Sequence, residues 1–263
     1  MSDLLPRDLA SGILRLTLND PATRNSLSEA MLAALRAALE DAATDNAVRV
    51  IVIAASGPVY CSGHNLKEMT ARRRAPDKGA AYFTALFDTC ARLMIAIVDH
   101  PKPVIAEVQG LASAAGCQLV ASCDLAIAAD TAGFCTPGVN IGLFCSTPMV
   151  ALSRNVAAKH AMELLLTGDV IAAHEAQRIG LINRAVSPNR LSEEVEALAR
   201  KIAAKSQLTL KTGKQAFTRQ RGMGLEEAYA YTARVMAENM LARDAEEGIA
   251  AFTAKRSPQW SDR

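Results

Sequence analysis

Apolar residues form four short patterns that predict strands in the first half of the chain. Apolar and polar residues alternate over Ile13–Leu18, which is typical of a strand with one solvent-facing side. Residues 50–54 and the segments Val104–Val108 and Leu125–Ala129 are instead almost continuously apolar. Such runs are typical of strands that are covered on both faces, so the pattern predicts a buried sheet.

Helical spacing of apolar residues predicts two long helices between these strands. The first helix is expected to follow a capping box formed by Ser26 and Glu29 and to end near Ala43. The second spans residues 83–97 and is amphipathic. Residues 62–79 between them are polar and irregular, which predicts a mobile surface segment.

The stretch from Gly110 to Asp124, GLASAAGCQLVASCD, combines small residues with a short apolar run. It predicts a loop that leads into a buried helix. Small residues let a ligand approach the backbone, and free N–H groups at a helix N-terminus can face a developing negative charge. A tightly packed helix crossing is the alternative interpretation.

The second half of the chain becomes mainly helical. Pro148 fits the first position (N1) of one helix, residues 162–166 form another, and residues 172–179 form a third that Gly180 ends. A strand is expected over residues 181–186. We predict a mixed α/β body over residues 1–205 and a helical region over residues 206–263 that breaks near 222–224.

Composition limits the classes of function. The chain has 263 residues, a net charge of +2, 50% hydrophobic residues and only 4% aromatic residues. Nothing here indicates a nucleic-acid partner, because basic patches and stacking aromatics are typical of such proteins. No CxxC pair occurs among the six cysteines, so we expect buried free thiols and a reducing, cytoplasmic location. We also expect no secretory signal and no membrane span.

Several common catalytic motifs are absent from the sequence. It contains no GxGxxG, GxxxxGK[ST] or GxSxG motif, which leaves Rossmann, P-loop and nucleophile-elbow chemistry unsupported. His174-Glu175 begins an HExxH-like pattern, but Arg178 stands where the second histidine would be. The four histidines are widely separated, so no metal site is predicted.

Three runs together resemble the crotonase family, the enoyl-CoA hydratase/isomerase superfamily. They are SGPVYCSGHNLKEM, PKPVIAEVQGLASAAGCQLVASCDLAIA and TPGVNIG, in the order and spacing of that family. The resemblance implies a ββα superhelix with a C-terminal helical region that drives assembly into a homotrimer or a dimer of trimers. It also implies an acyl-CoA thioester as substrate in fatty acid metabolism, with coenzyme A as part of the substrate and no separate cofactor.

The family's shared chemistry is stabilisation of a thioester enolate by two backbone N–H groups, an oxyanion hole. The matching positions here are His64 and Ala115. The resemblance also places Ser62, Gly63 and Gly116 beside the substrate. Leu66 and Lys67 match positions that line the CoA nucleotide. The run Arg72–Arg74 could meet CoA phosphates, but a solvated basic face is favoured.

The chain departs from the family at its acidic positions. The two glutamates with which a hydratase activates water are replaced by Gln118 and Gly138, and Ser146 stands where an isomerase carries a carboxylate. An amide cannot act as a general base at neutral pH, and general acid–base steps contribute roughly 10²–10⁴-fold each. The sequence therefore predicts thioester binding without efficient hydration.

Other polar residues have competing interpretations. His64 has the right pKa range for proton transfer, and some decarboxylating members of the family carry histidine here, but its backbone N–H alone can be what matters. Asn140 could bind substrate or cap a turn. Cys145 has no activating partner in the sequence and is expected to pack.

Three hypotheses follow for the function. The first is an enoyl-CoA hydratase-like lyase or isomerase, the second a decarboxylase or hydrolase of acyl-CoA thioesters that uses His64, and the third a noncatalytic acyl-CoA-binding protein. Glu68 is expected on the surface, and Glu107, in an apolar strand, is expected to form an ion pair across the fold.

Overall fold

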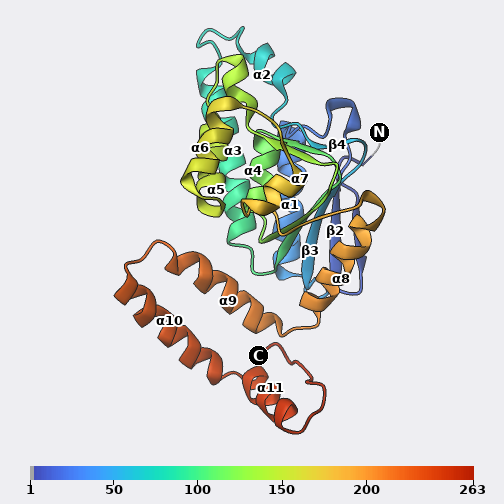
Figure 1. Cartoon of the computed structure of the whole chain (residues 1–263), viewed down its shortest axis with the longest axis vertical. Coiled ribbons are helices and arrows are strands. Elements are labelled where there is room, and N and C mark those ends of the chain that lie inside the picture. Colours follow the sequence, from blue (N-terminus) through green and yellow to red (C-terminus); the bar gives the residue numbers. More distant parts are fainter. Residues whose placement is uncertain (1–2) are drawn as a thin grey trace.

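The computed structural model describes residues 3–263 as a two-sheet body with a long helical arm (Figure 1). The larger sheet has the order β1-β2-β3-β5-β7-β10. Its strands are β1 (Arg7–Ala10), β2 (Ile13–Leu18), β3 (Val50–Ala55), β5 (Val104–Val108), β7 (Leu125–Ala129) and β10 (Arg184–Val186). All neighbours from β2 to β10 run parallel, and β1 joins β2 antiparallel. The continuous apolar runs thus form the buried parallel strands that they predicted.

A smaller sheet has the order β4-β6-β8-β9 and consists of strands of two or three residues. They are β4 (Val59–Cys61), β6 (Leu111–Ser113), β8 (Gly133–Cys135) and β9 (Ile171–Ala172). The chain alternates between the sheets: β3, β5 and β7 each lead directly into β4, β6 and β8. Each pair is then followed by helical structure, so successive ββα turns stack into a superhelix.

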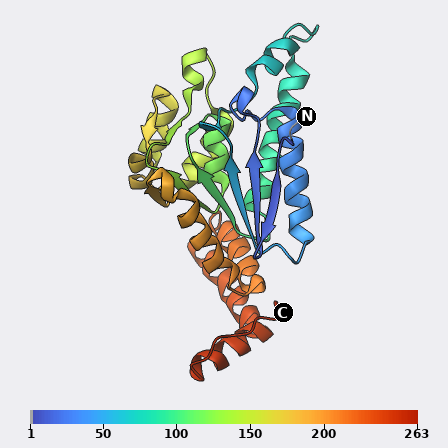
Figure 2. The same ribbon diagram turned by 90° about the vertical axis from the view of Figure 1, so that its right-hand side faces the viewer.

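The helices of the body cover both sides of the larger sheet. Helix α1 (Glu29–Thr44) packs on α3 (Ala80–Val98), while α8 (Leu191–Ala203) contacts β2, β3, β5 and β7. Figure 2 shows α1 and α3 on one side of the sheet and α8 on the other. The remaining helices of the body are α2 (Leu66–Arg72), α4 (Ala115–Ser122), α5 (Ser146–Asn155), α6 (Ala158–Thr167) and α7 (Ala173–Arg178), with 3-10 turns at Pro21–Thr23, Pro137–Ile141 and Pro188–Arg190.

Two helix starts differ from the sequence prediction. Helix α1 is capped by Ser28, whose side chain accepts from the Met31 N–H at 3.2 Å, and not by Ser26. The reason is that Leu27 still forms a parallel bridge with His64, which keeps the backbone extended up to Ser28. Helix α5 begins at Ser146, two residues before Pro148, which still lies in the first turn where proline is tolerated.

The segment predicted to be irregular contains helix α2. The Asn65 side chain caps it, because its Oδ1 accepts from the N–H groups of Lys67 at 3.1 Å and Glu68 at 3.3 Å. Glu68 in turn accepts from the Glu29 N–H at 3.3 Å, which ties α2 to the start of α1. Glu68 is only partly buried, so it lies at the surface as predicted, and its carboxylate also makes this contact.

Glu107 forms the ion pair that its position in an apolar strand predicted. Its Oε2 lies 2.8 Å from Arg15 Nη1, and its Oε1 accepts from Ser192 Oγ at 2.8 Å. The pair connects β5 with β2 and with α8, so it joins three elements of the buried layer. Pairing of this kind is what makes a buried carboxylate tolerable.

Helix α3 bears on the expectation that no segment spans a membrane. It is the one described helix long and apolar enough for a span by length and composition, with a mean hydropathy of 1.5 over 19 residues. Its side chains Leu86, Cys90, Leu93, Met94 and Ile97 are buried against the body. Because core helices meet the same criteria, this is weak evidence for a membrane span.

The arm consists of α9 (Gln207–Gln220), α10 (Leu225–Met240) and α11 (Arg243–Thr253), which extend away from the body (Figure 1). Breaks lie near Ser206, which caps α9, and at Gly222–Gly224 before α10, as the sequence predicted. Lys214 anchors α9 to the body through Asp124 Oδ2 at 2.6 Å and the Ile97 carbonyl at 3.0 Å.

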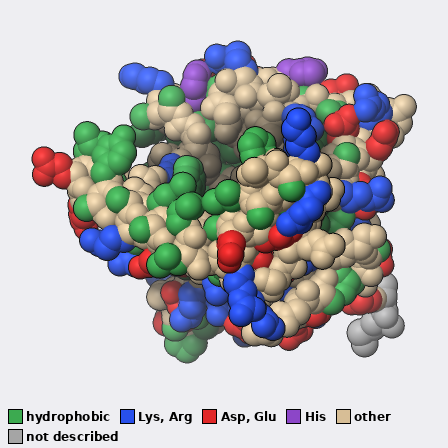
Figure 3. All heavy atoms as spheres, turned by 90° about the horizontal axis from the view of Figure 1, so that it is seen from below, with side chains coloured by type: hydrophobic (Ala, Val, Ile, Leu, Met, Phe, Trp, Pro, Cys, Tyr) green, Lys and Arg blue, Asp and Glu red, His purple; other side chains and the backbone are tan. Residues whose placement is uncertain are grey.

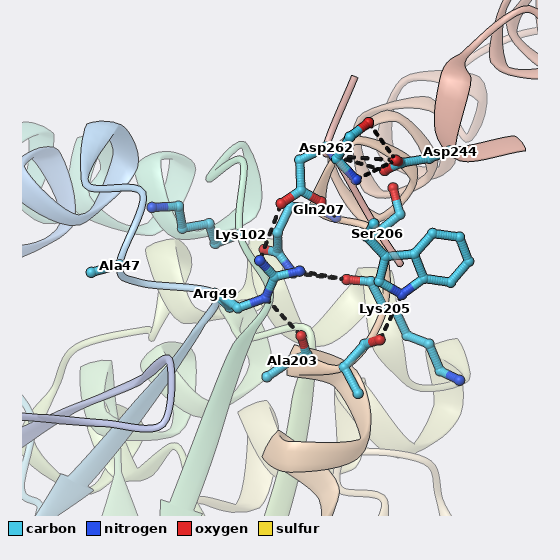
Figure 4. Close-up of polar contacts among 12 residues, drawn as sticks. Ala47, Arg49, Lys102, Ala203, Lys205, Ser206, Gln207, Asp244 and Asp262 are labelled. Atoms are coloured by element: carbon cyan, nitrogen blue, oxygen red, sulfur yellow. Dashed lines mark hydrogen bonds and ion pairs between the residues drawn. The ribbon is translucent and has the colours of Figure 1, made fainter. Parts of the chain in front are cut away.

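The last residues return to the junction between α8 and α9 and form what we call the C-terminal clasp, residues 259–263. Asp244 Oδ1 accepts from the Ser261 N–H at 2.7 Å, and Asp262 pairs with Arg49 at 3.1 Å. Asp262 also accepts from the Gln207 N–H at 2.7 Å, and Trp260 donates to the Ala204 carbonyl at 2.8 Å. Figure 4 shows Arg49, Gln207, Asp244 and Asp262 converging where the arm leaves the body.

Candidate functional site

The site residues predicted from the sequence follow three neighbouring parallel strands of the smaller sheet. Strand β4 pairs with β6 through Cys61 and Ala112, and β6 pairs with β8 through Ser113 and Cys135. Parallel neighbours end at the same edge of a sheet. The three segments that follow these strands, residues 62–66, 114–118 and 136–140, therefore leave the sheet side by side.

Close packing brings the first two segments together. A Cβ added to Gly63 would lie 3.0 Å from the Ala114 Cβ and 3.4 Å from the Ala115 nitrogen. A Cβ added to Gly116 would lie 2.3 Å from the Cys61 carbonyl oxygen. Both glycines are needed for this approach, since any side chain would force the segments apart.

The N–H groups of His64 and Ala115 lie on these two adjoining segments. Ala115 is the first residue of α4, where an N–H has no partner within the helix. Within residues 3–263, the hydrogen bonds of the chain provide no acceptor for either N–H group. The arrangement can therefore present two backbone donors to one oxygen of a ligand.

The imidazole of His64 is held in a mainly apolar setting. Its Nδ1 lies 3.4 Å from the Leu27 carbonyl oxygen, and its ring meets Phe87 of α3 edge to face at 5.5 Å between centroids. Its Nε2 is buried and has no hydrogen-bond partner in the described part of the chain. Because a carbonyl can only accept, the contact with Leu27 favours a proton on Nδ1 and leaves a lone pair on Nε2.

Burial lowers the pKa of His64 below its usual value of 6.5, and the hydrogen bond to Leu27 opposes this only in part. Desolvation disfavours the charged imidazolium, so the neutral ring is the form present at neutral pH. A neutral imidazole with a free Nε2 can accept a proton or a hydrogen bond from a bound molecule.

Three predicted substrate-binding residues lie at the start of α2 or just before it. Ser62 Oγ donates to the Thr23 carbonyl at 3.2 Å, so this hydroxyl serves the packing of the segment. Leu66 is 52% exposed and Lys67 is exposed as well, on the first turn of α2. Both side chains are therefore available at the surface.

Two of the neighbouring arginines, Arg72 and Arg73, contact other side chains of the protein. Arg72 lies 3.5 Å from Glu29 and 4.9 Å above the Tyr82 ring, while Arg73 lies 5.5 Å above the Phe83 ring. These contacts hold α2 against α1 and α3.

Gln118 lies one turn into α4 and is 3% exposed. Its N–H donates to the Ala114 carbonyl at 3.0 Å, but its side-chain Oε1 is buried without a partner among the described residues. A buried, unpaired amide oxygen costs free energy, roughly 1–3 kcal/mol. Such a group one turn from the Ala115 N–H fits a polar side chain that is available to a ligand.

Gly138 lies in the 3-10 turn after β8, and no side chain can be added there without displacement. A Cβ would lie 2.6 Å from the Leu143 carbonyl oxygen and 2.9 Å from Cys145 Sγ. The loop itself is closed by the Leu143 N–H, which donates to the Gly138 carbonyl at 2.9 Å. Leu143 and Cys145 thus fill the space that a second glutamate would need.

Asn140 and Cys145 have structural surroundings. Asn140 is exposed, and its Nδ2 would lie 3.0 Å from a Cβ added to Gly168, so it packs against the end of α6. Cys145 is buried, and burial raises the pKa of its thiol above 9.0 while a hydrogen bond with Gly138 opposes the shift. A thiol held protonated in this way is a poor nucleophile.

Two hollows elsewhere on the described body contain none of these residues. One, of ≈ 210 Å³, lies between α1 and α3 beside Glu29, Leu32 and Tyr82. The other, of ≈ 200 Å³, lies between α6 and α7 beside His160 and Glu175. The candidate site is therefore recognised by its backbone donors rather than by these hollows.

Comparison with known sequences decides the family. The sequence profile of the enoyl-CoA hydratase/isomerase family matches residues 8–263. The chain belongs to the enoyl-CoA hydratase/isomerase family. The resemblance found in the three sequence runs is thereby confirmed, and family members act on acyl-CoA thioesters.

Named relatives share close to half of the residues. The rat and human proteins called enoyl-CoA hydratase domain-containing protein 3, mitochondrial, are each 48% identical over 250 residues, which cover 95% of this chain. The match spans 82% of the rat protein and 81% of the human one. The 2,3-dehydroadipyl-CoA hydratase of Escherichia coli K12 is 33% identical over 252 residues, 95% of this chain and 96% of that protein.

Solved structures confirm the crotonase fold. An enoyl-CoA hydratase of Mycobacterium smegmatis matches with a TM-score of 0.94 and 49% identity over 98% of this chain and 99% of that chain. Human enoyl-CoA hydratase domain-containing protein 3 matches with a TM-score of 0.93 and 46% identity over 98% and 100%. The predicted ββα superhelix with a C-terminal helical region is therefore correct.

The comparisons also correct the predicted cytoplasmic location. The rat and human relatives are both named as mitochondrial proteins. The cytoplasmic prediction rested on free cysteines and on composition, and a reducing compartment inside a cell is compatible with more than one location. That evidence could not distinguish cytoplasm from mitochondrion.

Proposed function

We propose that the protein binds acyl-CoA thioesters and stabilises the thioester enolate with the backbone N–H groups of His64 and Ala115. The observation that supports this most is the pair of unpartnered donors on segments that leave adjoining parallel strands. A carbonyl oxygen that gains charge is stabilised by preorganised donors, and each one typically contributes about 10²–10³ in kcat. Gly63 and Gly116 allow the approach, and Leu66 and Lys67 border the CoA nucleotide.

Efficient hydration is not part of this proposal. Gln118 supplies an amide where the family's hydratases carry an acid, and Gly138 has no room for a side chain. The buried Gln118 amide binds and orients the acyl group through hydrogen bonds. Neither position has a carboxylate that could take a proton from water. Membership of the enoyl-CoA hydratase/isomerase family therefore reflects common ancestry more than hydratase activity.

His64 is the proton-accepting group in the enzymatic version of the proposal. With a proton on Nδ1, its Nε2 lone pair takes a proton from a water molecule that attacks the thioester carbon. The C–S bond then breaks, and the CoA thiolate leaves and takes that proton from the imidazolium, which gives the free acid and CoA. In decarboxylation of a malonyl-type thioester, the bond to CO₂ breaks and its electron pair is delocalised onto the thioester oxygen, where the two N–H donors stabilise it. The α-carbon of this enolate then takes a proton from water to give the product thioester. No metal or separate cofactor enters either reaction, and both are reactions of an acyl-CoA.

The test is turnover of a panel of thioesters by purified protein. Crotonyl-CoA is followed by loss of the enoyl absorbance, and malonyl-type and saturated acyl-CoA thioesters are followed by product release. His64→Ala retains the backbone N–H and removes the ring, so a loss of roughly 10²-fold or more would assign the ring to proton transfer. Fast hydration of crotonyl-CoA would contradict the claim that efficient hydration is lost. Unchanged turnover of every thioester by His64→Ala would contradict the role of the His64 ring in proton transfer.

A noncatalytic acyl-CoA-binding protein is the second candidate, favoured by the absence of both acids. It predicts micromolar binding of acyl-CoA by calorimetry without turnover of any member of the panel. For either candidate, we propose that the protein assembles through the arm into a homotrimer or a dimer of trimers. We also propose a mitochondrial location, as the names of the rat and human relatives give for those proteins. Absence of binding to any acyl-CoA would exclude both candidates.

A further inference from the structure

Ala114, between β6 and α4, has a backbone conformation that is unusual for a residue with a side chain. Its φ is 51° and its ψ is −116°. Arg24, another non-glycine residue with positive φ, has a ψ of 43° and so lies in the ordinary left-handed region. The angles of Ala114 instead match the first central position of a type II′ turn, which glycine dominates. The Cβ of Ala114 therefore makes this conformation strained.

Contacts on both sides hold Ala114 in this conformation. Its N–H donates to the Cys135 carbonyl of β8 at 2.9 Å, and its carbonyl accepts from the Gln118 N–H of α4 at 3.0 Å. The peptide unit between Ala114 and Ala115, which carries the Ala115 N–H, is thus fixed between a strand and a helix. Strain of this kind persists only where the surroundings hold it, and it is concentrated at functional sites.

The methyl group of Ala114 lies against the other donor segment. A Cβ built on Gly63 would be only 3.0 Å from the Ala114 Cβ. Gly63 itself has a φ of 90° and immediately precedes His64. The methyl group therefore fills the space between the two segments and limits how closely they approach. A glycine at position 114 would relieve the strain but would leave this space empty.

We propose that Ala114 is a positioning residue that sets the separation and direction of the His64 and Ala115 N–H groups. This inference rests on the proposed function, since it concerns the same pair of donors. Donors stabilise a developing charge only when they are held at the right geometry, and a displacement of about 1 Å can cost 10²-fold in rate. The strained methyl group is retained because it keeps the pair rigid.

The test compares stability with recognition of the thioester oxygen in Ala114→Gly. Recognition is measured by calorimetry as the affinity ratio of butyryl-CoA to the butyl-CoA thioether, which lacks the carbonyl oxygen. For the unchanged protein we expect a ratio of about tenfold, equivalent to one or two net hydrogen bonds. In Ala114→Gly we expect unfolding at a higher urea concentration, because relief of strain exceeds the added chain entropy, and a ratio at least about threefold smaller.

Two variants control for the exchange of alanine for glycine. Ala114→Ser keeps a Cβ and should keep the ratio. Ala121→Gly, at the far end of α4, should lower the urea midpoint and leave the ratio unchanged, because its effect is on the helix alone. Opposite changes in stability and recognition at position 114 would not arise from a residue with a purely structural role.

The outcomes separate the two proposals. If the unchanged protein prefers the thioester and Ala114→Gly keeps that preference, the positioning role is wrong and the donor pair stands. If stability and preference fall together in Ala114→Gly, general loosening explains the result and the positioning role is again wrong. If the unchanged protein binds both ligands equally, the donor pair itself is wrong, and the role of Ala114 falls with it.

Discussion

At the scale of single residues, the buried ring of His64 should make stability depend on pH. Burial lowers its folded-state pKa below 6.5, so the unfolded chain binds more protons between the two values. The free energy of unfolding should therefore decrease as pH falls from above 6.5 through the lowered pKa, and level off below it.

Urea unfolding at pH 7.5 and pH 5.5 tests this effect. We expect His64→Gln to lose less stability between these two values than the unchanged protein, because glutamine does not titrate. His174→Gln, at an exposed position in α7, serves as the control and should follow the unchanged protein. An equal loss in all three proteins would show that the His64 ring does not titrate in this range.

Restoring a glutamate at position 138 should not restore a hydratase. The Leu143 carbonyl and Cys145 Sγ occupy the space that its Cβ would need, so Gly138→Glu should destabilise the protein by about 1–3 kcal/mol through overpacking. Crotonyl-CoA hydration should remain at the level of the unchanged protein. Gly222→Glu, which points into open space, should leave the free energy of unfolding unchanged. A stable, hydrating Gly138→Glu protein would disprove this account.

The sequence alone identified the candidate residues of the site, but it could not predict their geometry. Gln118 and Gly138 were visible as departures from the family pattern, whereas the reason that Gly138 excludes a side chain lies in Leu143, which only the folded loop brings close. The strained backbone of Ala114 has no signal in a run of small residues, because alanine rarely adopts such angles.

At the scale of helices and strands, apolar patterns of five or more residues predicted the larger sheet, whereas the short strands of the smaller sheet could not be predicted. The parallel strands β2, β3, β5 and β7 follow from five- or six-residue apolar patterns. The smaller sheet, on which the site depends, is made of strands of two or three residues that are too short to show a period. Helix α2 was missed because its cap, Asn65, stands in a polar run that hides the helix start.

The C-terminal clasp should stabilise the start of α9. Burial raises the pKa of Asp244, but hydrogen bonds from Ser206 and Ser261 outweigh it and the net pKa is lowered. Asp244→Asn should therefore lower the free energy of unfolding at pH 7 by about 1–3 kcal/mol and speed amide exchange in the first turn of α9. The difference from the unchanged protein should shrink as pH falls from 3.8 through the lowered pKa, because the unfolded chain binds a proton at this carboxyl before the folded protein does.

The matched control for the clasp is Glu246→Gln, an exposed position on the same helix. It removes the same charge from α11 without touching the residues at the C-terminus, so we expect little change in stability. If Asp244→Asn and Glu246→Gln behaved alike, the charge of α11 would matter and the hydrogen bonds of the clasp would not.

At the scale of the whole molecule, the arm exposes more apolar surface than a monomer can readily tolerate. Helix α10 has no buried residue, and Leu225, Tyr229, Leu241 and Phe252 are between 71% and 88% exposed. The view from the arm end shows hydrophobic side chains open to solvent among charged ones (Figure 3). A helix of this kind gains most of its stability from packing, so we expect its apolar side to pack on a partner surface.

Leu241→Asp should therefore weaken assembly without unfolding the body. Light scattering after size exclusion should give a trimer or a dimer of trimers for the unchanged protein and a smaller mass for the variant, because a charge placed in a buried apolar contact costs several kcal/mol. Gln215→Glu, which adds the same charge at an exposed position of α9, should keep the larger mass.

Because the clasp and Lys214 fix the direction of the arm, Asp244→Asn should broaden the distribution of masses rather than abolish assembly. A monomeric unchanged protein would show that the exposed face of the arm has another use.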